Sequence, residues 1–436
     1  MSIPLEFNNA FDGLKPSSTL YINETVNKLW AQGHQVFHMG FGESRFDVHS
    51  RLQSALASNA NKKSYLPARG LPQLTAQVAT YYSQKLGLDF TQEQVIVGPG
   101  SKSLIYGLQM IMDADVFLPT PSWVSYGPQA ILLGNRCKYI PSSPSDNYRF
   151  NIEAFDQLVT ASTNPCKLVI INSPNNPSGE VWPAELLREI ADYCRSNGIW
   201  VLSDEIYFEV CHGSVDHVSI SKFYPEGTIV MGGLSKHLSV GGWRLGVALM
   251  PDSEQGQDIM RKMVLFASES WSGVAAPIQY AAIEAYACHD DLESYVADCR
   301  AIHGIRTRFI KSALTELGIV CSGGEGAFYL TANFDRYAAK LAAIGIQTSD
   351  QLAAHLLDAY RIATLPGSDF GIPKEQQSLR LSTSYLDMET EFDAQRIFDL
   401  YRNEEENKRI MSVSNHPNTH DAINAFKDFL RSLAKA

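Results

Sequence analysis

Short apolar runs alternate with amphipathic segments through the middle of the chain. The runs expected to form strands are Gln94 to Val97, Val116 to Leu118, Leu168 to Ile171, Trp200 to Leu202, Thr228 to Met231 and Gly246 to Met250. Between them apolar residues recur at helical spacing, as in Ala184 to Ser196, which stops at Gly198. This alternation is typical of α/β proteins and predicts a mostly parallel central sheet with helices on both faces. In such folds ligands bind beyond the carboxyl ends of the strands.

The last third of the chain has a different pattern, which predicts a second, smaller α+β domain. Its expected elements are a long helix from about Asp290 to Leu317 and strands at Gly326 to Ala332 and Leu379 to Ser382. A charged helix, a polar loop and an amphipathic helix follow, so we expect a C-terminal helical extension from about residue 388. We therefore expect a large domain over residues 45–290 and assign residues 291–436 to the small domain.

Composition narrows the classes of partner. The chain has 436 residues, 45% hydrophobic content and a formal net charge of −11. Nucleic acids and anionic membranes need a basic surface, so we expect neither as a partner. The start, Met-Ser-Ile-Pro-Leu-Glu-Phe, lacks the features of a leader peptide, and no stretch is long enough to span a membrane, which together predict a cytoplasmic location. Seven scattered cysteines favour a reduced compartment and no metal framework.

The candidate chemistry centres on Lys236 in Gly-Gly-Leu-Ser-Lys-His, which Arg244 follows eight residues later in Gly-Gly-Trp-Arg-Leu-Gly. Upstream, Asn176 stands in Ser-Pro-Asn-Asn-Pro-Ser-Gly, and Asp204 and Tyr207 stand in Ser-Asp-Glu-Ile-Tyr. Taken singly, each has an ordinary alternative as a surface lysine, a helix cap or a turn residue. Their joint order at strand ends resembles the cofactor site of class I and II aminotransferases. These are fold-type I enzymes, similar to aspartate aminotransferase, that work through pyridoxal 5′-phosphate.

The resemblance implies a role for each of these residues. Lys236 would hold the cofactor aldehyde as a Schiff base and move a proton to and from the substrate α-carbon. Asp204 would pair with the pyridine nitrogen and keep it protonated. Tyr207 and Asn176 would donate hydrogen bonds to the cofactor's phenolic oxygen, and Asn176 would also lie beside the substrate. Trp123, in Pro-Ser-Trp-Val-Ser-Tyr, would stack on the cofactor ring, with a buried core tryptophan as the alternative.

A phosphate group needs backbone N–H groups at a helix start and a guanidinium. Gly100-Ser101-Lys102 opens a helical run, and Arg244 would supply the guanidinium. The family's phosphate-binding hydroxyl three residues before the lysine is absent, because Gly233 stands there. We therefore expect the phosphate to be held by backbone groups together with three side chains, Ser101, Ser235 and Arg244. By resemblance, Tyr65 reaches the phosphate of a neighbouring subunit, which predicts a homodimer with shared active sites.

The substrate residues also follow from the resemblance. Arg380, in Ser-Leu-Arg-Leu-Ser, would hold the substrate α-carboxylate in two parallel hydrogen bonds, and the backbone of Gly42 would approach the same group. Lys102 falls where a bacterial aspartate aminotransferase branch places a lysine that meets the distal carboxylate of an acidic substrate. It could equally serve the phosphate or point to solvent. Arg69 and Trp271 depart from that branch and could reshape the side-chain pocket.

The resemblance covers about residues 15–386 and groups residues 1–44 with the small domain. The sequence thus predicts a transaminase that moves an α-amino group from aspartate, glutamate or a similar amino acid to a 2-oxo acid in two ping-pong stages. The alternatives are other fold-type I reactions, by a β-lyase, racemase, decarboxylase or ring-forming synthase, because all of these share Lys236 and Asp204. A non-catalytic sensor domain would need a helix-turn-helix unit, which is not visible before Gly40.

Overall fold

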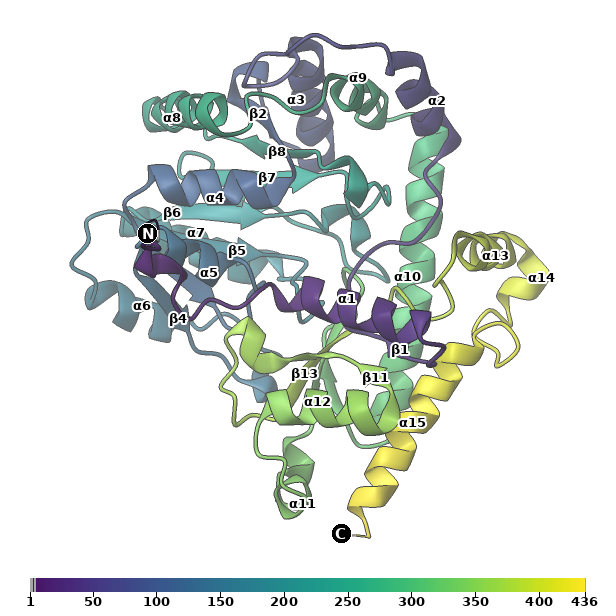
Figure 1. Cartoon of the computed structure of the whole chain (residues 1–436). Helices are drawn as coiled ribbons and strands as arrows, with labels where there is room; N and C mark the ends of the chain where they lie inside the picture. The colour runs from purple at the N-terminus through teal and green to yellow at the C-terminus, as the bar shows by residue number, and fades with distance from the viewer. Residues whose placement is uncertain (1–2, 4, 436) are drawn as a thin grey trace.

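The computed structural model describes residues 3 and 5–435. Residues 1, 2, 4 and 436, which fall in the segments assigned to the small domain, lie outside the described residues. A seven-stranded sheet forms the core of the larger part of the molecule (Figure 1). β8 runs antiparallel to both of its neighbours, and the other strand pairs are parallel. In sheet order the strands are β2 (Val95–Gly98), β8 (Gly246–Leu249), β7 (Thr228–Gly233), β6 (Trp200–Asp204), β5 (Lys167–Asn172), β3 (Asp115–Pro119) and β4 (Cys137–Ile140).

Helices cover both faces of this sheet, which confirms the expected α/β fold. Along β5, Leu168 and Ile170 join one hydrophobic cluster, whereas Val169 and Ile171 join another on the opposite face. The helices of the first face are α4 (Ser101–Ile111), α5 (Tyr126–Leu132) and α8 (Glu254–Ser270). Those of the second face are α3 (Pro72–Leu86), α6 (Ile152–Thr160) and α7 (Ala184–Ser196), with α2 (Ser50–Asn59) and α9 (Ala276–Ala285) packed near α3.

A smaller antiparallel sheet lies beside the first in the lower part of Figure 1. Its strands, in sheet order, are β12 (Leu365–Pro366), β13 (Ser378–Ser382), β10 (Tyr329–Asn333) and β9 (Val320–Ser322). A separate parallel pair joins β1 (Phe37–His38) to β11 (Ile362–Ala363), so the N-terminal segment packs with this unit. The helices around it are α1 (Ser18–Ala31), α11 (Ala338–Ala343), α12 (Ser349–Tyr360) and α15 (Pro417–Leu433).

One long helix, α10 (Asp290–Glu316), contributes to the cores of both parts of the molecule. Leu292 and Ile302 pack in the cluster beside the large sheet, whereas Ile310 and Leu314 pack beside the small one. Figure 1 shows α10 running along one side of the molecule past both sheets. Side chains on this helix can therefore fix the position of one part relative to the other.

The segment after β13 leads away from the small sheet, and its later part packs back against its beginning. It contains α13 (Glu391–Arg402) and α14 (Glu404–Asn407), and α15 follows. The carboxylate of Asp387 accepts hydrogen bonds from the backbone N–H groups of Asn418 and Thr419 at 2.7 and 2.9 Å, so it caps α15 at the point where the segment packs back. Among the described residues, no helix combines the length and apolar character needed to cross a bilayer.

The expected strands need correction, because β4 and the short strands β1, β9, β11 and β12 were not expected. The edge strand β4 mixes exposed, half-buried and buried residues and carries no continuous apolar run. The strand expected over residues 326–332 begins only at Tyr329, because Ala327 has a left-handed backbone with φ 54° that interrupts the extended chain.

Candidate active site

A cavity of ≈ 480 Å³ opens beyond the carboxyl ends of β5, β6 and β7, between the two sheets. This is the position expected for ligands in an open α/β sheet. Most of the sequence-predicted site residues line it, namely Gly42, Ser101, Lys102, Trp123, Asn176, Asp204, Tyr207, Ser235, Lys236, Arg244 and Arg380. Gly100 lies at its edge as the N-cap of α4, whereas Tyr65 is 99% exposed and does not line the cavity of its own chain.

Asp204 ends β6 and lies almost fully buried beside the cavity. The Tyr126 hydroxyl donates a hydrogen bond to Oδ2 at 2.6 Å, and the backbone N–H of Ile206 donates to Oδ1 at 3.3 Å. Burial raises the pKa of Asp204 to about 6, while these two hydrogen bonds oppose the rise by favouring the ionised form. Asp204 is thus a buried carboxylate held ready for a cationic partner in the cavity.

Asn176 belongs to a loop that is fastened to the same strand. The side chain of Asn172 donates to the carbonyl of Asp204 at 2.7 Å and accepts from the Asn176 N–H at 2.7 Å. The Oδ1 atom of Asn176 is buried and has no hydrogen-bond partner among the described residues. A buried amide with unused hydrogen-bonding capacity at a cavity wall indicates a site for a polar ligand.

Tyr207 and Tyr329 form a hydroxyl pair at 2.8 Å. Burial raises the pKa of Tyr207 well above its usual value, so its hydroxyl stays protonated and can donate. The Tyr329 hydroxyl, carried by β10, also lies 3.5 Å from the carbonyl of Gly42. These contacts join the end of the large sheet to the small sheet across the cavity.

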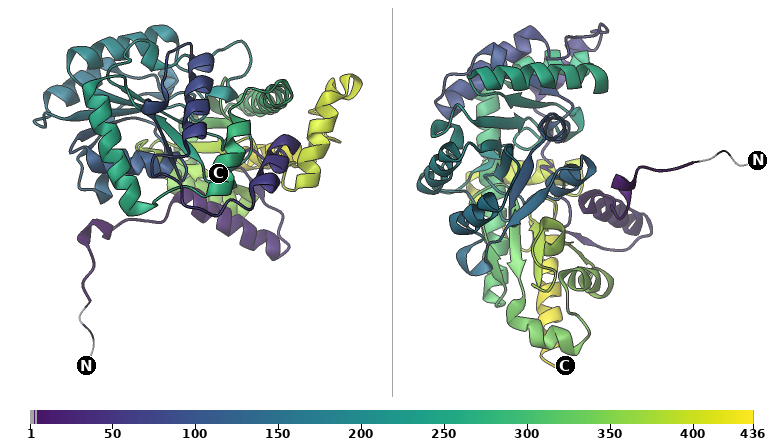
Figure 2. Two further views of the ribbon diagram at one scale, coloured as in Figure 1. Left: turned by 90° about the horizontal axis from the view of Figure 1, so that it is seen from above. Right: turned by 90° about the vertical axis from the view of Figure 1, so that its left-hand side faces the viewer.

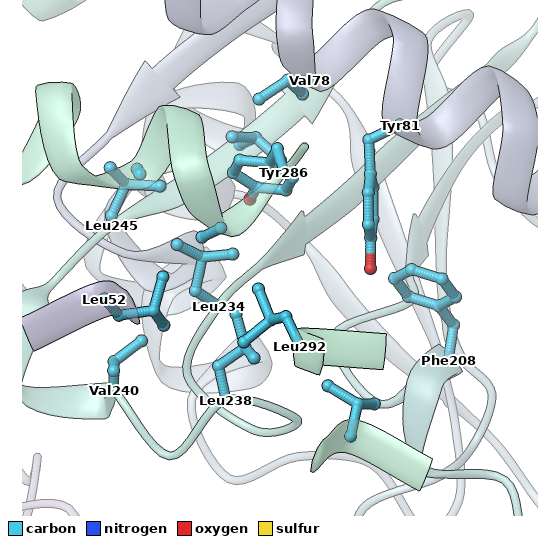
Figure 3. Packing of buried hydrophobic residues seen from close by; sticks show 14 of the residues in the cluster. Leu52, Val78, Tyr81, Phe208, Leu234, Leu238, Val240, Leu245, Tyr286 and Leu292 are labelled. Atoms are coloured by element: carbon cyan, nitrogen blue, oxygen red, sulfur yellow. The ribbon is translucent and has the colours of Figure 1, made fainter. Parts of the chain in front are cut away.

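Lys236 lies on the loop after β7, and apolar neighbours fix that loop. Figure 3 shows Leu234, Leu238 and Val240 pointing into the hydrophobic cluster that also holds Leu245. Lys236 itself is half-buried, and its Nζ donates to the Gly42 carbonyl at 3.1 Å. The amine therefore faces the cavity while the residues two positions before and after it anchor the loop.

A cluster of cations lies at the N-terminal end of α4. Arg244 has a left-handed backbone with φ 52° and donates through Nη1 to the Gly241 carbonyl at 2.9 Å. Gly100 has a φ of 84°, a backbone conformation that favours glycine, and the Arg244 guanidinium packs closely against it. Lys102 Nζ lies 5.0 Å from the Trp123 ring, and burial, followed by the charges of Arg244 and Lys236, lowers its pKa. A helix N-terminus beside these cations can bind an anion.

Arg380, in the middle of β13, is 1% exposed. Its Nη2 donates to the Gly40 carbonyl, and its guanidinium lies 4.9 Å from the centre of the Tyr329 ring. The Nε atom has no partner, and no carboxylate lies within ion-pair distance of Arg380 among the described residues. A buried guanidinium without an anion is costly, so its place in a cavity wall indicates an anionic ligand.

The missing hydroxyl at position 233 has a steric cause. A Cβ atom there would lie 2.9 Å from the Leu245 carbonyl oxygen and 3.2 Å from the Gly246 Cα, because β7 and β8 approach closely. The ring of Trp271 packs 5.3 Å from that of Phe266 in the core beside α8, so it does not line the cavity of its own chain. Arg69 likewise stands outside that lining.

Sequence reasoning missed Tyr126, Asn172 and Tyr329, which position the expected residues. Tyr126 is the last residue of the Trp123 motif, and Asn172 directly precedes the Asn176 motif. The bonds of Tyr126 to Asp204, of Asn172 to the Asp204 carbonyl and of Tyr329 to Tyr207 depend on tertiary packing. No local spacing in the sequence predicts them.

The fold and the arrangement of this cavity define a class of enzyme. The family described as aminotransferase class I and II matches residues 35–391, and the chain belongs to this family. It is an aminotransferase of fold type I, as the sequence predicted. The aspartate aminotransferase of Geobacillus stearothermophilus is 36% identical over 386 residues, covering 86% of this chain and 94% of that protein. A probable aspartate/prephenate aminotransferase of Aquifex aeolicus is 31% identical, covering 83% of this chain and 90% of that protein.

Solved structures agree with this assignment. The aspartate aminotransferase of Thermus thermophilus with maleate superposes with a TM-score of 0.79 at 26% sequence identity. That comparison covers 94% of this chain and all of the Thermus chain. The family match confirms the resemblance on which the cofactor prediction was based, and members of this family depend on pyridoxal phosphate.

Proposed function

We propose that this protein is a pyridoxal-phosphate-dependent aminotransferase for acidic amino acids and 2-oxo acids. The observation that carries the proposal is the unpaired, buried guanidinium of Arg380 in the same cavity as the Lys236 amine and the Asp204 carboxylate. Amino-group exchange on this cofactor requires a cation that anchors the substrate carboxylate, an amine, and a protein carboxylate that pairs with the ring nitrogen.

The residues of the cavity fit pyridoxal phosphate. Asp204 would hold the pyridine nitrogen, and its raised pKa of about 6 reflects a buried carboxylate that a cation would stabilise. Asn176, through its side-chain Nδ2, and Tyr207, through its hydroxyl, would donate hydrogen bonds to the phenolic oxygen. The cation cluster at the start of α4, with Ser101, Ser235 and Arg244, would hold the phosphate. When bound, the cofactor supplies an electron sink for the bond that breaks at the substrate α-carbon.

In the proposed reaction, Arg380 and Lys236 have different roles. Arg380 would hold the substrate α-carboxylate and so fix the orientation of the α-carbon, which is a positioning effect. Lys236 would anchor the cofactor and carry the proton to and from the substrate α-carbon. Its place on a loop fixed by buried leucines keeps the amine within reach of both tasks.

Lys102 supports the preference for acidic substrates. Its ammonium lies over the Trp123 ring on the cavity wall and makes no ion pair with the described residues, so it can pair with a second carboxylate. The Thermus structure was solved with maleate, a dicarboxylate. Phe41 and Leu20 form an apolar part of the same wall, where the carbon skeleton of a substrate would pack.

The proposed active form is a homodimer. Tyr65, whose expected partner is the phosphate of a second copy, is 99% exposed in the single chain. The N-terminal segment, which leads away from the body in Figure 2, exposes 78% of Phe7 and 64% of Phe11. Apolar side chains this exposed indicate a surface that a second copy covers.

The test of the reaction is a half-reaction panel. The protein, loaded with pyridoxal phosphate, is mixed with single amino acids, and we expect aspartate and glutamate to convert the cofactor to its amine form with release of the matching 2-oxo acid. Lys236→Ala should lose this conversion and the borohydride-trapped adduct, whereas Lys262→Ala, on exposed α8 surface, should keep both. Release of ammonia, carbon dioxide or the opposite enantiomer instead would identify one of the alternative reactions.

The test of the substrate class uses Lys102→Gln. We expect kcat/KM for aspartate to fall about 10- to 100-fold, because one charge-assisted contact of ~1.5–3 kcal/mol is lost. The same variant should change the reaction with an apolar amino acid less than about threefold. An equal loss for both substrates would show that Lys102 serves the cofactor rather than the distal carboxylate.

A further inference from the structure

The segment from Gly40 to Ser44 crosses the cavity and is held at every second residue. The Gly40 carbonyl accepts from Arg380, and the Gly42 carbonyl accepts from Lys236 Nζ at 3.1 Å. The Ser44 hydroxyl then meets two further side chains. These contacts fasten the segment at Gly40, Gly42 and Ser44.

The contact at Ser44 is a buried polar cluster that the proposed chemistry does not use. Its Oγ lies 2.7 Å from Oγ of Ser239 and 3.2 Å from Nε2 of His303. Ser239 stands three residues after Lys236 on the same loop, and its backbone is left-handed with φ 57°. His303 comes from the middle of α10. One hydroxyl therefore joins the cavity-crossing segment, the lysine loop and the helix shared by both parts of the molecule.

His303 is enclosed by aromatic rings that lead back to the lysine. Its ring centre is 4.8 Å from that of Phe328 and 5.1 Å from that of Phe46. The Phe328 ring centre lies 5.8 Å from Lys236 Nζ. Burial, and then the charges of Arg306 and His212, keep the pKa of His303 well below its usual value, so the imidazole is neutral. A neutral ring in this position forms a fixed hydrogen bond and does not titrate with the reaction.

We propose that Ser44 and His303 are positioning residues that set the distance between the Gly42 carbonyl and the Lys236 amine. This inference rests on the proposed function. Gly42 lies where the substrate α-carboxylate is expected, and Lys236 supplies the amine, so the Ser44 cluster fixes two reacting regions relative to each other. Groups that position a substrate act through their geometry, so a contact that fixes Gly42 relative to Lys236 matters for how the substrate is held.

The experiment compares Ser44→Ala with a matched control on the same helix. Thr307, four residues after His303, forms a buried hydroxyl pair with Thr383 at 2.6 Å, and this pair makes no hydrogen bond to Ser44, Ser239 or Lys236 among the described residues. Thr307→Val therefore removes a comparable hydrogen bond without touching the segment from Gly40 to Ser44. For Ser44→Ala we expect a five- to tenfold rise in KM for the amino acid and in the Kd of maleate, both at unchanged pyridoxal phosphate content. Thr307→Val should leave both values within twofold at a similar loss of Tm.

A second variant separates positioning from folding. Ser239→Ala removes the other end of the 2.7 Å contact, so it should raise the same two constants, and the double variant with Ser44→Ala should add little more. Equal changes in Ser44→Ala and Thr307→Val, or fully additive effects in the double variant, would overturn the inference. Failure of the proposed function is distinct, because then the unmodified protein itself would not exchange amino groups.

Discussion

Replacing Tyr126 by phenylalanine removes one oxygen atom and tests how Asp204 is held. The Tyr126 hydroxyl donates to Asp204 at 2.6 Å in a fully buried setting. A hydrogen bond to a charged group contributes ~1.5–3 kcal/mol, and 1.36 kcal/mol corresponds to about one pKa unit. Without that bond the pKa of Asp204, raised by burial to about 6, should therefore rise by a further one to two units.

The consequence is a pH-dependent loss of cofactor affinity. A pyridinium nitrogen pairs with the ionised form of Asp204, so affinity follows the ionised fraction of that carboxylate. At pH 7 the ionised fraction falls roughly two- to tenfold in Tyr126→Phe, whereas near about pH 9 the variant and the unmodified protein should converge. The measurement is the Kd of pyridoxal phosphate for the apoenzyme, titrated by absorbance at several pH values.

A second tyrosine provides the control. Tyr193 donates to Asp156 at 2.8 Å on the exposed surface of α7, so Tyr193→Phe removes the same kind of bond outside the cavity. Its affinity curve should overlie that of the unmodified protein. The reasoning is refuted if Tyr126→Phe gives a curve of unchanged shape, or a loss of affinity that is the same at every pH.

Three further outcomes follow from the same geometry. Burial raises the pKa of Asp204 from 3.8 to about 6, so its ionisation lowers the folding stability of the apoenzyme by on the order of 3 kcal/mol as pH rises through that window. Asp204→Asn removes this cost, so it should raise the Tm of the apoenzyme at neutral pH while abolishing turnover. Arg380→Ala should raise KM about 100-fold or more and leave cofactor content within twofold, as steady-state kinetics and absorbance will show. Gly233→Ser should destabilise the protein by ~1–3 kcal/mol in urea unfolding without tightening cofactor binding, because its Cβ would crowd the Leu245 carbonyl.

Local patterns of apolar and polar residues were sufficient to predict the longer buried strands and the amphipathic helices. Strands buried on both faces, such as β5 and β7, are continuous apolar runs, and the sequence-predicted helix over 184–196 matches α7 at both ends. The half-buried strand β4 lacks such a run and was missed. Strand ends in a parallel sheet meet at one edge, so Asn176, Asp204 and Lys236 were expected to lie together.

Contacts between distant segments could not be predicted in this way. Tyr126 meets Asp204 across 78 residues, Tyr207 meets Tyr329 across 122, and Ser44 meets His303 across 259. No periodicity relates such partners, because each pairing depends on how helices and loops pack once the sheets have formed. The motif residues therefore indicate the chemistry, and the residues that orient them become visible only in three dimensions.

The hydrogen-bond partners of two buried arginines, Arg306 and Arg380, indicate that the cavity binds an anion. Arg306 and Arg380 are both fully buried, yet the terminal nitrogens of Arg306 donate to the carbonyls of Ser384 and Leu386 and contact the sulfur of Met388. The described contacts of Arg380 include one such acceptor, the Gly40 carbonyl, and the guanidinium faces the cavity. The Nε atoms of both arginines lack a partner among the described residues, but both terminal nitrogens of Arg306 have protein acceptors, whereas those of Arg380 leave hydrogen-bonding capacity toward the cavity for a ligand. In a chain with a net charge of −11, the cations that line this cavity create a local positive potential that draws carboxylates and phosphate to that position.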